Sequence, residues 1–418
     1  MFCMPTRLEF VMGIRKGLVL LGGITIAFGL LGCDGPTKQG VQARSAASER
    51  VNIVNAQMSF DQARRAFEVG QFDRALREIQ AAVNRYPDEP KYHLLEGRIY
   101  HEMHRLEDAQ RSLTRAIELN DEFSDAHYFL GIVYQRWSNH EMAFDHYWKA
   151  AQADTNKVQY LLAAAEALVT LGEYDRAQEV IQQKSSHFEH NAAIRHLQGK
   201  VALLQDDPVR AARLLGEARL LNPDDLMLLE ELAWAQYEAQ QYGRSYESIS
   251  HLLQRSQERR SDLMLMQARC LVFTDRLIEA RNVYLELTQH DSSDVDAWIE
   301  LGSVAAELGD HRRVAISAGR IIALAPERFE GYLLRAMYER EQGNDHEVAL
   351  QIEKAVERAD DSILPLLMMG SLHEERGQYE AAARSYGRAL LKSPKHDLAQ
   401  AGFNRASNRT QITHVPTE

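Results

Sequence analysis

The histidine and glutamate side chains of this 418-residue sequence come closest to a metal-binding pattern at His101-Glu102-Met103-His104. The two histidines are three residues apart, so they lack the H-E-x-x-H spacing that places two imidazoles side by side for zinc. His140 and His146 could in principle add ligands, but they follow in the turn and second helix of the next repeat unit. We therefore expect solvated side chains at a helix end, with no metal and no cofactor.

Motifs for phosphate binding and nucleophilic catalysis are absent from the sequence. It contains no G-x-x-x-x-G-K-[ST], no G-x-G-x-x-G and no G-x-S-x-G. Cys270 lies among Leu265, Leu271 and Val272, and apolar surroundings raise a thiol pKa instead of activating the thiol. A formal net charge of -12 argues against a nucleic-acid-binding surface. We therefore expect neither an enzyme acting on a small-molecule substrate nor a nucleic-acid-binding protein.

The N-terminus has a pattern typical of exported proteins. Arg15 and Lys16 precede an apolar run over residues 17–32, which is short and rich in glycine for a membrane-spanning helix. The run ends in Leu-Leu-Gly-Cys at residues 30–33, which resembles the bacterial lipobox, where a signal peptide is removed before a lipid-carrying cysteine. An uncleaved anchor and a translation start at Met12 stay open as alternatives.

The lipobox resemblance implies a bacterial lipoprotein. Residues 1–32 would be the signal peptide, and Cys33 would carry the lipid, which palmitate labelling detects. Residues 33–55 contain small and polar residues without sustained apolar periodicity, and we expect a flexible tether there. The protein would lie in the cell envelope, facing the periplasm. Asp34 favours the inner membrane by analogy with enteric bacteria, but the choice between inner and outer membrane stays open.

Small residues recur through the remaining sequence with a period of 34. They are Ala63, Gly97, Gly131, Ala165, Gly199, Ala233, Ala268, Gly302, Ala336 and Gly370, and the one interval of 35 precedes Ala268. This spacing predicts ten helix hairpins over residues 56–396, with the extra residue in the polar run 254–261. Residues 397–418 would form a short capping helix with Leu398, Ala401 and Phe403, and then a frayed tail.

The cleanest copy of the unit spans Ile363 to His396 and resembles the tetratricopeptide repeat. Gly370 and Ala382 let two helices approach, a Gly377-x-Tyr379 turn joins them, and Pro394 closes the unit. The resemblance implies an all-α fold, an α-solenoid with about ten helix-turn-helix hairpins in a right-handed superhelix. Some repeats depart from the pattern. Lys184 replaces a small residue in the fourth repeat and predicts a short second helix, while the sixth and seventh lack the turn glycine and suggest a change of pitch.

The same resemblance implies a concave groove lined by the first helix of each hairpin. Mapping the second, fifth, ninth and twelfth positions onto the chain gives Arg98, His101, Tyr128, Ile132, Leu162, Glu166, His196, Lys200, Leu203, Trp234, Tyr237, Leu265, Arg269, Val272, Leu333, Met337 and Arg340. Trp234 and Tyr237 are the leading candidates for a contact, because aromatic side chains dominate interfaces. The Lys and Asn pair with which some of these domains clamp a terminal carboxylate is absent, so an extended or helical segment fits better.

These features together predict a membrane-tethered scaffold that binds segments of protein partners without chemistry of its own. Two alternatives remain. One is an assembly factor for an exported polymer, either a type IV pilus or an exopolysaccharide. The other is a recruiting subunit of an envelope enzyme. The sequence leaves the partner, the pathway and the oligomeric state open.

Overall fold

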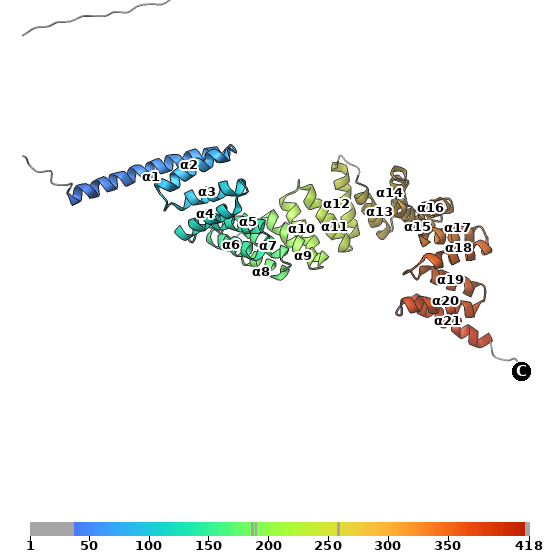
Figure 1. The fold of residues 1–418 in the computed structure, drawn as a ribbon. Coiled ribbons are helices and arrows are strands. Elements are labelled where there is room, and N and C mark those ends of the chain that lie inside the picture. The colour runs from blue at the N-terminus through green and yellow to red at the C-terminus, as the bar shows by residue number, and fades with distance from the viewer. Residues whose placement is uncertain (1–36, 185–187, 189, 257–259, 414–418) are drawn as a thin grey trace, which may run out of the picture. The chain divides into compact units, whose positions relative to one another are not determined.

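The computed structural model describes residues 37–184, 188, 190–256 and 260–413, and all regular structure within them is helical (Figure 1). The helices are α1 (Lys38–Glu68), α2 (Phe72–Arg85), α3 (Pro90–Glu102), α4 (Leu106–Leu119), α5 (Ser124–Arg136), α6 (His140–Ala153), α7 (Val158–Thr170), α8 (Tyr174–Gln183), α9 (Ala192–Leu204), α10 (Pro208–Leu221), α11 (Leu226–Glu238), α12 (Tyr242–Arg255), α13 (Ser261–Phe273), α14 (Leu277–His290), α15 (Val295–Glu307), α16 (His311–Leu324), α17 (Phe329–Glu341), α18 (Asp345–Arg358), α19 (Leu364–Glu375), α20 (Tyr379–Lys392) and α21 (Asp397–Thr413). The all-α prediction is confirmed.

The predicted signal peptide and Cys33 lie outside the described residues. Within the described ranges, no helix is both long enough and apolar enough to cross a membrane. The chain divides into two compact units, one ending at Asp88 and the other beginning at Glu89. The first contains α1 and α2, and the second contains α3 to α21.

The helix α1 differs from the flexible tether expected over residues 33–55. It is one continuous helix of 31 residues from Lys38, and the side chain of its N-cap residue Thr37 accepts a hydrogen bond from the Gly40 N–H. Ala, Arg, Gln and Glu in this stretch favour a helix, and nearly all side chains of its N-terminal half are exposed to solvent. Ala56, Ser59, Ala63 and Ala66 on its C-terminal half are buried, where α1 packs on α2.

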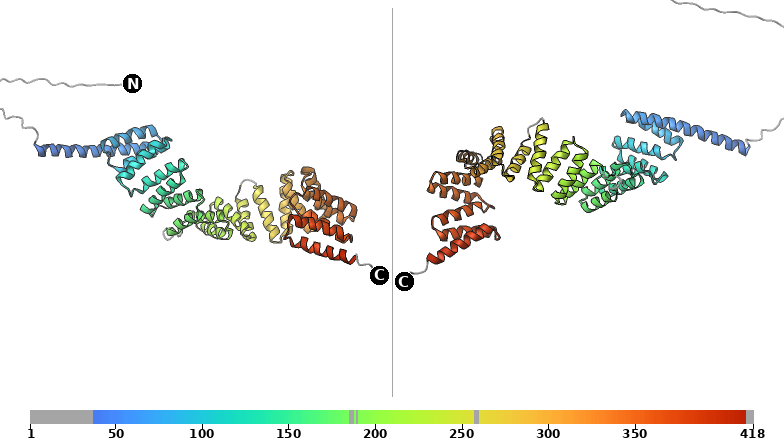
Figure 2. Two further views of the ribbon diagram at one scale, coloured as in Figure 1. Left: turned by 60° about the horizontal axis from the view of Figure 1, so that its bottom comes forward. Right: turned by 180° about the vertical axis from the view of Figure 1, so that it is seen from behind.

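The second unit is a continuous stack of hairpins. Each helix from α3 to α21 packs against the next in chain order, and Figure 2 shows the helices side by side in two further views. The first helices of some successive hairpins also touch, as α15 and α17 do. Each hairpin thus buries its apolar face against its neighbours, which is the arrangement of a solenoid. The predicted α-solenoid is confirmed.

The small residues at each period sit at helix crossings. All ten are buried. A Cβ atom added at Gly97 would lie 2.6 Å from the Leu113 side chain, and one added at Gly370 would lie 2.6 Å from the ring of Tyr386. A larger residue would therefore push the two helices of a hairpin apart. Close helix approach is the physical reason for the period of small residues.

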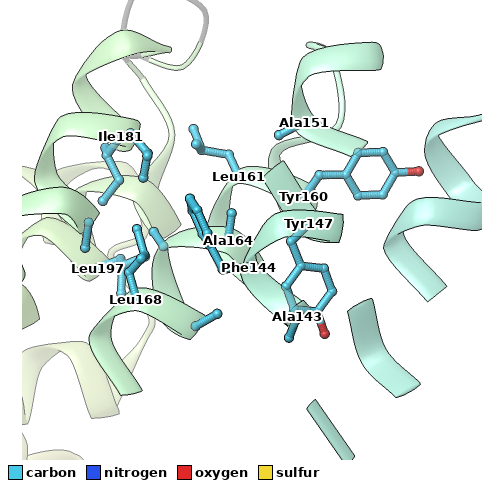
Figure 3. Close-up of a cluster of buried hydrophobic side chains, with 14 of the residues drawn as sticks. Ala143, Phe144, Tyr147, Ala151, Tyr160, Leu161, Ala164, Leu168, Ile181 and Leu197 are labelled. Atoms are coloured by element: carbon cyan, nitrogen blue, oxygen red, sulfur yellow. The ribbon is translucent and has the colours of Figure 1, made fainter. Parts of the chain in front are cut away.

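The apolar core continues from hairpin to hairpin. Figure 3 shows one section, in which Phe144 and Tyr147 from α6 lie with Tyr160, Leu161 and Leu168 from α7 and with Ile181 from α8. Leu197 from α9 extends the same cluster into the next hairpin, so the hairpins in this section share their core.

Every hairpin turn contains one residue in the left-handed conformation. Five are glycines, Gly70, Gly172, Gly309, Gly343 and Gly377, with φ between 69° and 77°. The other five are His104, Ser138, Asp206, Gln240 and Asp275, with φ between 57° and 59°. The turn geometry is therefore the same in the sixth and seventh repeats, although they lack the turn glycine.

The second helix of the fourth repeat and the C-terminal capping helix can be compared with their predictions. The helix α8 has only 10 residues and ends at Gln183, one residue before Lys184, which confirms the short second helix of the fourth repeat. The capping helix α21 is longer than expected and continues to Thr413. It packs on α20 through Ala399, Phe403 and Ala406, whereas Leu398 is 70% exposed. The expected roles of Leu398 and Ala401 in capping were wrong, because the register of α21 turns both toward solvent.

Candidate partner-binding groove

An apolar hollow at the predicted groove positions is lined by residues of α15, α17 and α19. It has a volume of about 360 Å³. Its lining residues are Ile299, Ser303, Ala306, Glu307, Glu330, Leu333, Leu334, Met337, Leu364 and Met368. A second cavity of about 240 Å³ adjoins it and shares Ala306, Met337 and Met368 with it. We refer to the first cavity and this extension as the α15–α17–α19 groove.

The repeat geometry places these residues together. Ile299, Ser303 and Ala306 occupy the fifth, ninth and twelfth positions of the eighth repeat, one helical face of α15. Leu333 and Met337 occupy the fifth and ninth positions of the ninth repeat on α17. Met337 is 42% exposed, while Leu333 is only 5% exposed and forms the floor. The sequence prediction identified Leu333, Met337 and Arg340, the last of which lines the extension, but not the α15 or α19 residues. The same repeat positions would have found Ile299, Ser303 and Ala306 of α15.

The charged residues that line the groove are Glu307, Glu330 and Glu341, together with Arg340 and His311. Glu330 accepts hydrogen bonds from the Arg328 guanidinium at 2.9 and 3.1 Å, and Glu341 lies 3.8 Å from His311 Nε2. Glu307 is exposed and has no ion-pair partner among the residues that the structure describes. An apolar hollow beside an unpaired carboxylate suits a segment with apolar side chains and a nearby Lys or Arg.

Aromatic side chains gather at the sixth and seventh repeats. The rings of Trp234 and Tyr237 meet edge to face, with centroids 6.4 Å apart, and Tyr237 also meets Tyr242 and Phe273. Tyr242 and Phe273 stack at 4.3 Å. Trp234 is 44% exposed and Phe273 is 56% exposed, whereas burial raises the pKa of Tyr237. Sequence reasoning found Trp234 and Tyr237 but missed Phe273, which ends α13 and joins the cluster only through the stacking of hairpins.

The basic residues predicted for the groove are mostly paired with acids one repeat later. Arg269 Nε donates to Glu300 Oε1 at 3.1 Å, and Arg340 Nη2 lies 3.3 Å from Glu375 Oε2. His196 contacts Glu231 in the same way. These charges are therefore largely neutralised within the solenoid, and the groove is less basic than its sequence suggests. Lys200 differs, because it is exposed and has no ion pair within the described part of the chain.

The remaining predicted groove residues divide between packing and surface. Tyr128, Ile132 and Leu162 are half-buried against the core cluster of Figure 3, and the rings of Tyr128 and Tyr160 are 4.9 Å apart. Leu203, Leu265 and Val272 are half-buried against the clusters of later hairpins, and Glu166 is exposed. Arg98 stacks over the Phe129 ring at 4.7 Å, and His101 Nδ1 lies 3.4 Å from Glu102. The structure does not bring these residues together with the α15–α17–α19 groove.

The histidines are arranged differently from the cluster considered in the sequence. His104 takes the left-handed conformation after α3, and His146 instead contacts His127, with 3.0 Å between their Nδ1 atoms. Across the described ranges, no group of three or more His, Cys, Asp or Glu side chains is placed to hold a metal ion. Cys270 is fully buried among apolar side chains, and burial raises its pKa, as predicted for a core thiol.

An array of helix hairpins, each packed against the next, defines an α-solenoid. Comparison with protein families then gives the type of repeat, because two family models match this chain. The one described as "Tetratricopeptide repeat" covers residues 60–102, and the one described as "Tetratricopeptide repeat protein 21 ARM repeat" covers residues 87–226. The repeats in this part of the chain are therefore of the tetratricopeptide type.

Individual similar proteins match this chain over parts of its length. Superkiller complex protein 3 of Mus musculus is 32% identical over 92 residues, which is 21% of this chain and 6% of that protein. A tetratricopeptide repeat protein from Parabacteroides merdae is 15% identical, with a TM-score of 0.42 over 60% of this chain and 98% of that one. YrrB, described as a TPR protein with an unusual peptide-binding site, is 18% identical, with a TM-score of 0.37 over 46% of this chain and 95% of its own.

Proposed function

We propose that this protein is a membrane-tethered scaffold that holds a segment of a partner protein in the α15–α17–α19 groove. The observation that supports this most is the groove itself, an apolar hollow of about 360 Å³ lined by the half-exposed Met337 and flanked by the unpaired Glu307. Tetratricopeptide repeats bind peptide or protein partners, and the likeness of fold makes such a role the natural one for this chain.

The partner segment carries two or three apolar side chains and at least one Lys or Arg. The apolar side chains fill the hollow between Ile299, Met337 and Met368, and the cation lies beside Glu307. Trp234 and Phe273, which are exposed at the sixth and seventh repeats, offer a second contact for a longer segment.

The lipid anchor to the membrane is the second part of the proposal. Lipid on Cys33 anchors the chain to the cell envelope of a bacterium, with the solenoid facing the periplasm. Palmitate labelling of intact cells tests it, because Cys33→Ser should abolish both the label and the recovery of the chain with membranes. Equal palmitate labelling of the wild type and of Cys33→Ser would contradict a lipid anchor on Cys33, but it would leave binding at the groove untouched.

Affinity capture from detergent-solubilised membranes tests the groove. Met337→Glu places a charge on the apolar wall and should remove the captured partner. Leu220→Glu is the matched control, because Leu220 lies on α10 and is 84% exposed, so it should capture as the wild type does. Capture that is equal in the two variants would contradict binding at the groove.

A further inference from the structure

The exposed half of α1 bears an apolar stripe that its own unit leaves uncovered. Ala43, Ala47, Val51, Val54 and Met58 follow one another at intervals of four, four, three and four residues, which keeps them on one face of a helix. Val51, Val54 and Met58 are 58%, 59% and 57% exposed, and the two alanines are exposed as well.

This stripe faces away from α2. The buried face of α1 consists of Ala56, Ser59, Ala63 and Ala66, and Arg85 of α2 reaches it through a hydrogen bond of 2.8 Å to the Ser59 hydroxyl. At 100° per residue, the stripe through Val54 and Met58 lies on the opposite side of the helix. Burial against α2 therefore explains one face of α1 and leaves the other without a partner in its unit.

Charges at the two ends of the stripe indicate what covers it. Arg44 and Asp61 flank the same face. Arg44 has no ion-pair partner among the described residues, whereas Asp61 lies 3.4 Å from Arg64 and accepts a hydrogen bond from Gln57 in its own helix. If two copies of α1 lie antiparallel about an axis midway between Val51 and Val54, those valines face each other and Ala47 faces Met58. Arg44 of each copy then faces Asp61 of the other, which gives two ion pairs by symmetry.

A parallel pair of α1 helices would lack these ion pairs between Arg44 and Asp61. It would place Arg44 beside Arg44 and Asp61 beside Asp61, and like charges at these positions oppose association. We therefore infer that α1 pairs antiparallel with α1 of a second copy of this chain, so that the protein is a homodimer joined through Lys38–Glu68. The pairing uses no residue of the α15–α17–α19 groove and stands independently of it.

Charge reversal in the full-length chain, purified in detergent, tests the pairing. Sedimentation over a concentration series should show a reversible dimer. Arg44→Asp should raise its dissociation constant about tenfold or more, because it creates two like-charge contacts. Adding Asp61→Arg to Arg44→Asp should restore association, and Glu49→Arg, which is off the stripe, should leave it unchanged. Circular dichroism checks that each variant retains its helix content.

Cross-linking tests the direction of the pair. The photoreactive residue p-benzoylphenylalanine at position 47 should attach near Met58 of the other copy. These positions lie about 16 Å apart within one helix, so a link between them reports on two chains. A chain that is monomeric at every concentration, a dimer indifferent to both charge reversals, or a link from position 47 to position 47 would each overturn the inference.

Discussion

The Nδ1 atoms of His127 on α5 and His146 on α6 lie 3.0 Å apart, and His127 Nε2 lies 3.0 Å from the Asp121 carbonyl oxygen. A carbonyl only accepts, so His127 donates from Nε2, and its Nδ1 accepts the proton of His146 Nδ1. Both imidazoles are then neutral. Burial lowers the pKa of both rings, and repulsion from His127 and Lys149 adds to the effect at His146, whose pKa falls to about 4.

This pair predicts that acid destabilises the solenoid. An unfolded histidine titrates near 6.5, so between this pH and about 4 the unfolded chain binds more protons than the folded one. The contribution of the pair to the free energy of unfolding is complete above pH 6.5 and is lost as the pH drops to 4. The expected loss is about 2 kcal/mol, which is less than the full linkage value because solvent screens a partly exposed ring. Urea unfolding across this range should show a smaller decline for His146→Gln than for the wild type. Identical declines would show that the pair contributes nothing.

The left-handed residue Gln240 predicts a stabilising change. A side chain at φ 57° is strained, so Gln240→Gly should raise the free energy of unfolding by about 1 kcal/mol. The converse change Gly377→Gln, at φ 69°, should lower it by a similar amount. Thermal unfolding of the two variants measures both, and shifts in the same direction would be incompatible with a shared turn geometry.

Two glycines on helices predict opposite effects of the same change. A Cβ at Gly370 would lie 2.6 Å from the Tyr386 ring, so Gly370→Ala should cost about 1–3 kcal/mol of stability. A Cβ added at Gly216 on α10 would meet nothing within 4 Å, so Gly216→Ala should stabilise by up to about 1 kcal/mol. Denaturant midpoints distinguish the two, and stabilisation at both sites would refute the packing role of Gly370.

The thiol of Cys270 is expected to be inert in the folded protein. It is fully buried, and burial raises its pKa, which lowers the fraction of reactive thiolate. Iodoacetamide should leave the Cys270 peptide unmodified in the native chain and modify it completely in urea, as read by mass spectrometry. Rapid native modification would show that the sixth and seventh repeats open readily.

Periodic packing was the predictable part of this fold. The positions of Gly97 and Gly370 follow from how closely two helices must approach, and each copy of the pattern reports the same contact. The left-handed conformation at Gln240 was not evident, because glutamine has no preference for turns. Only its place in the repeat could have revealed it.

Exposed helices and charge pairing were not predictable in the same way. The helix over residues 38–55 was missed, because hardly any side chain there is buried and its apolar stripe begins with two alanines, which give only a weak periodic signal. The basic residues of the groove looked available in the sequence, but Arg269 and Arg340 meet Glu300 and Glu375 once the hairpins stack. Contacts between repeats depend on register and rotamer, which a single repeat does not encode.

Hydrogen–deuterium exchange on a captured complex tests the central claim most directly. If a partner segment occupies the α15–α17–α19 groove, amides of α15 (Val295–Glu307), α17 (Phe329–Glu341) and α19 (Leu364–Glu375) should exchange more slowly in the complex than in the free chain. The amides of α10 should be unchanged. Slower exchange confined to α10 and α12, with no change in α15, α17 and α19, would contradict the account.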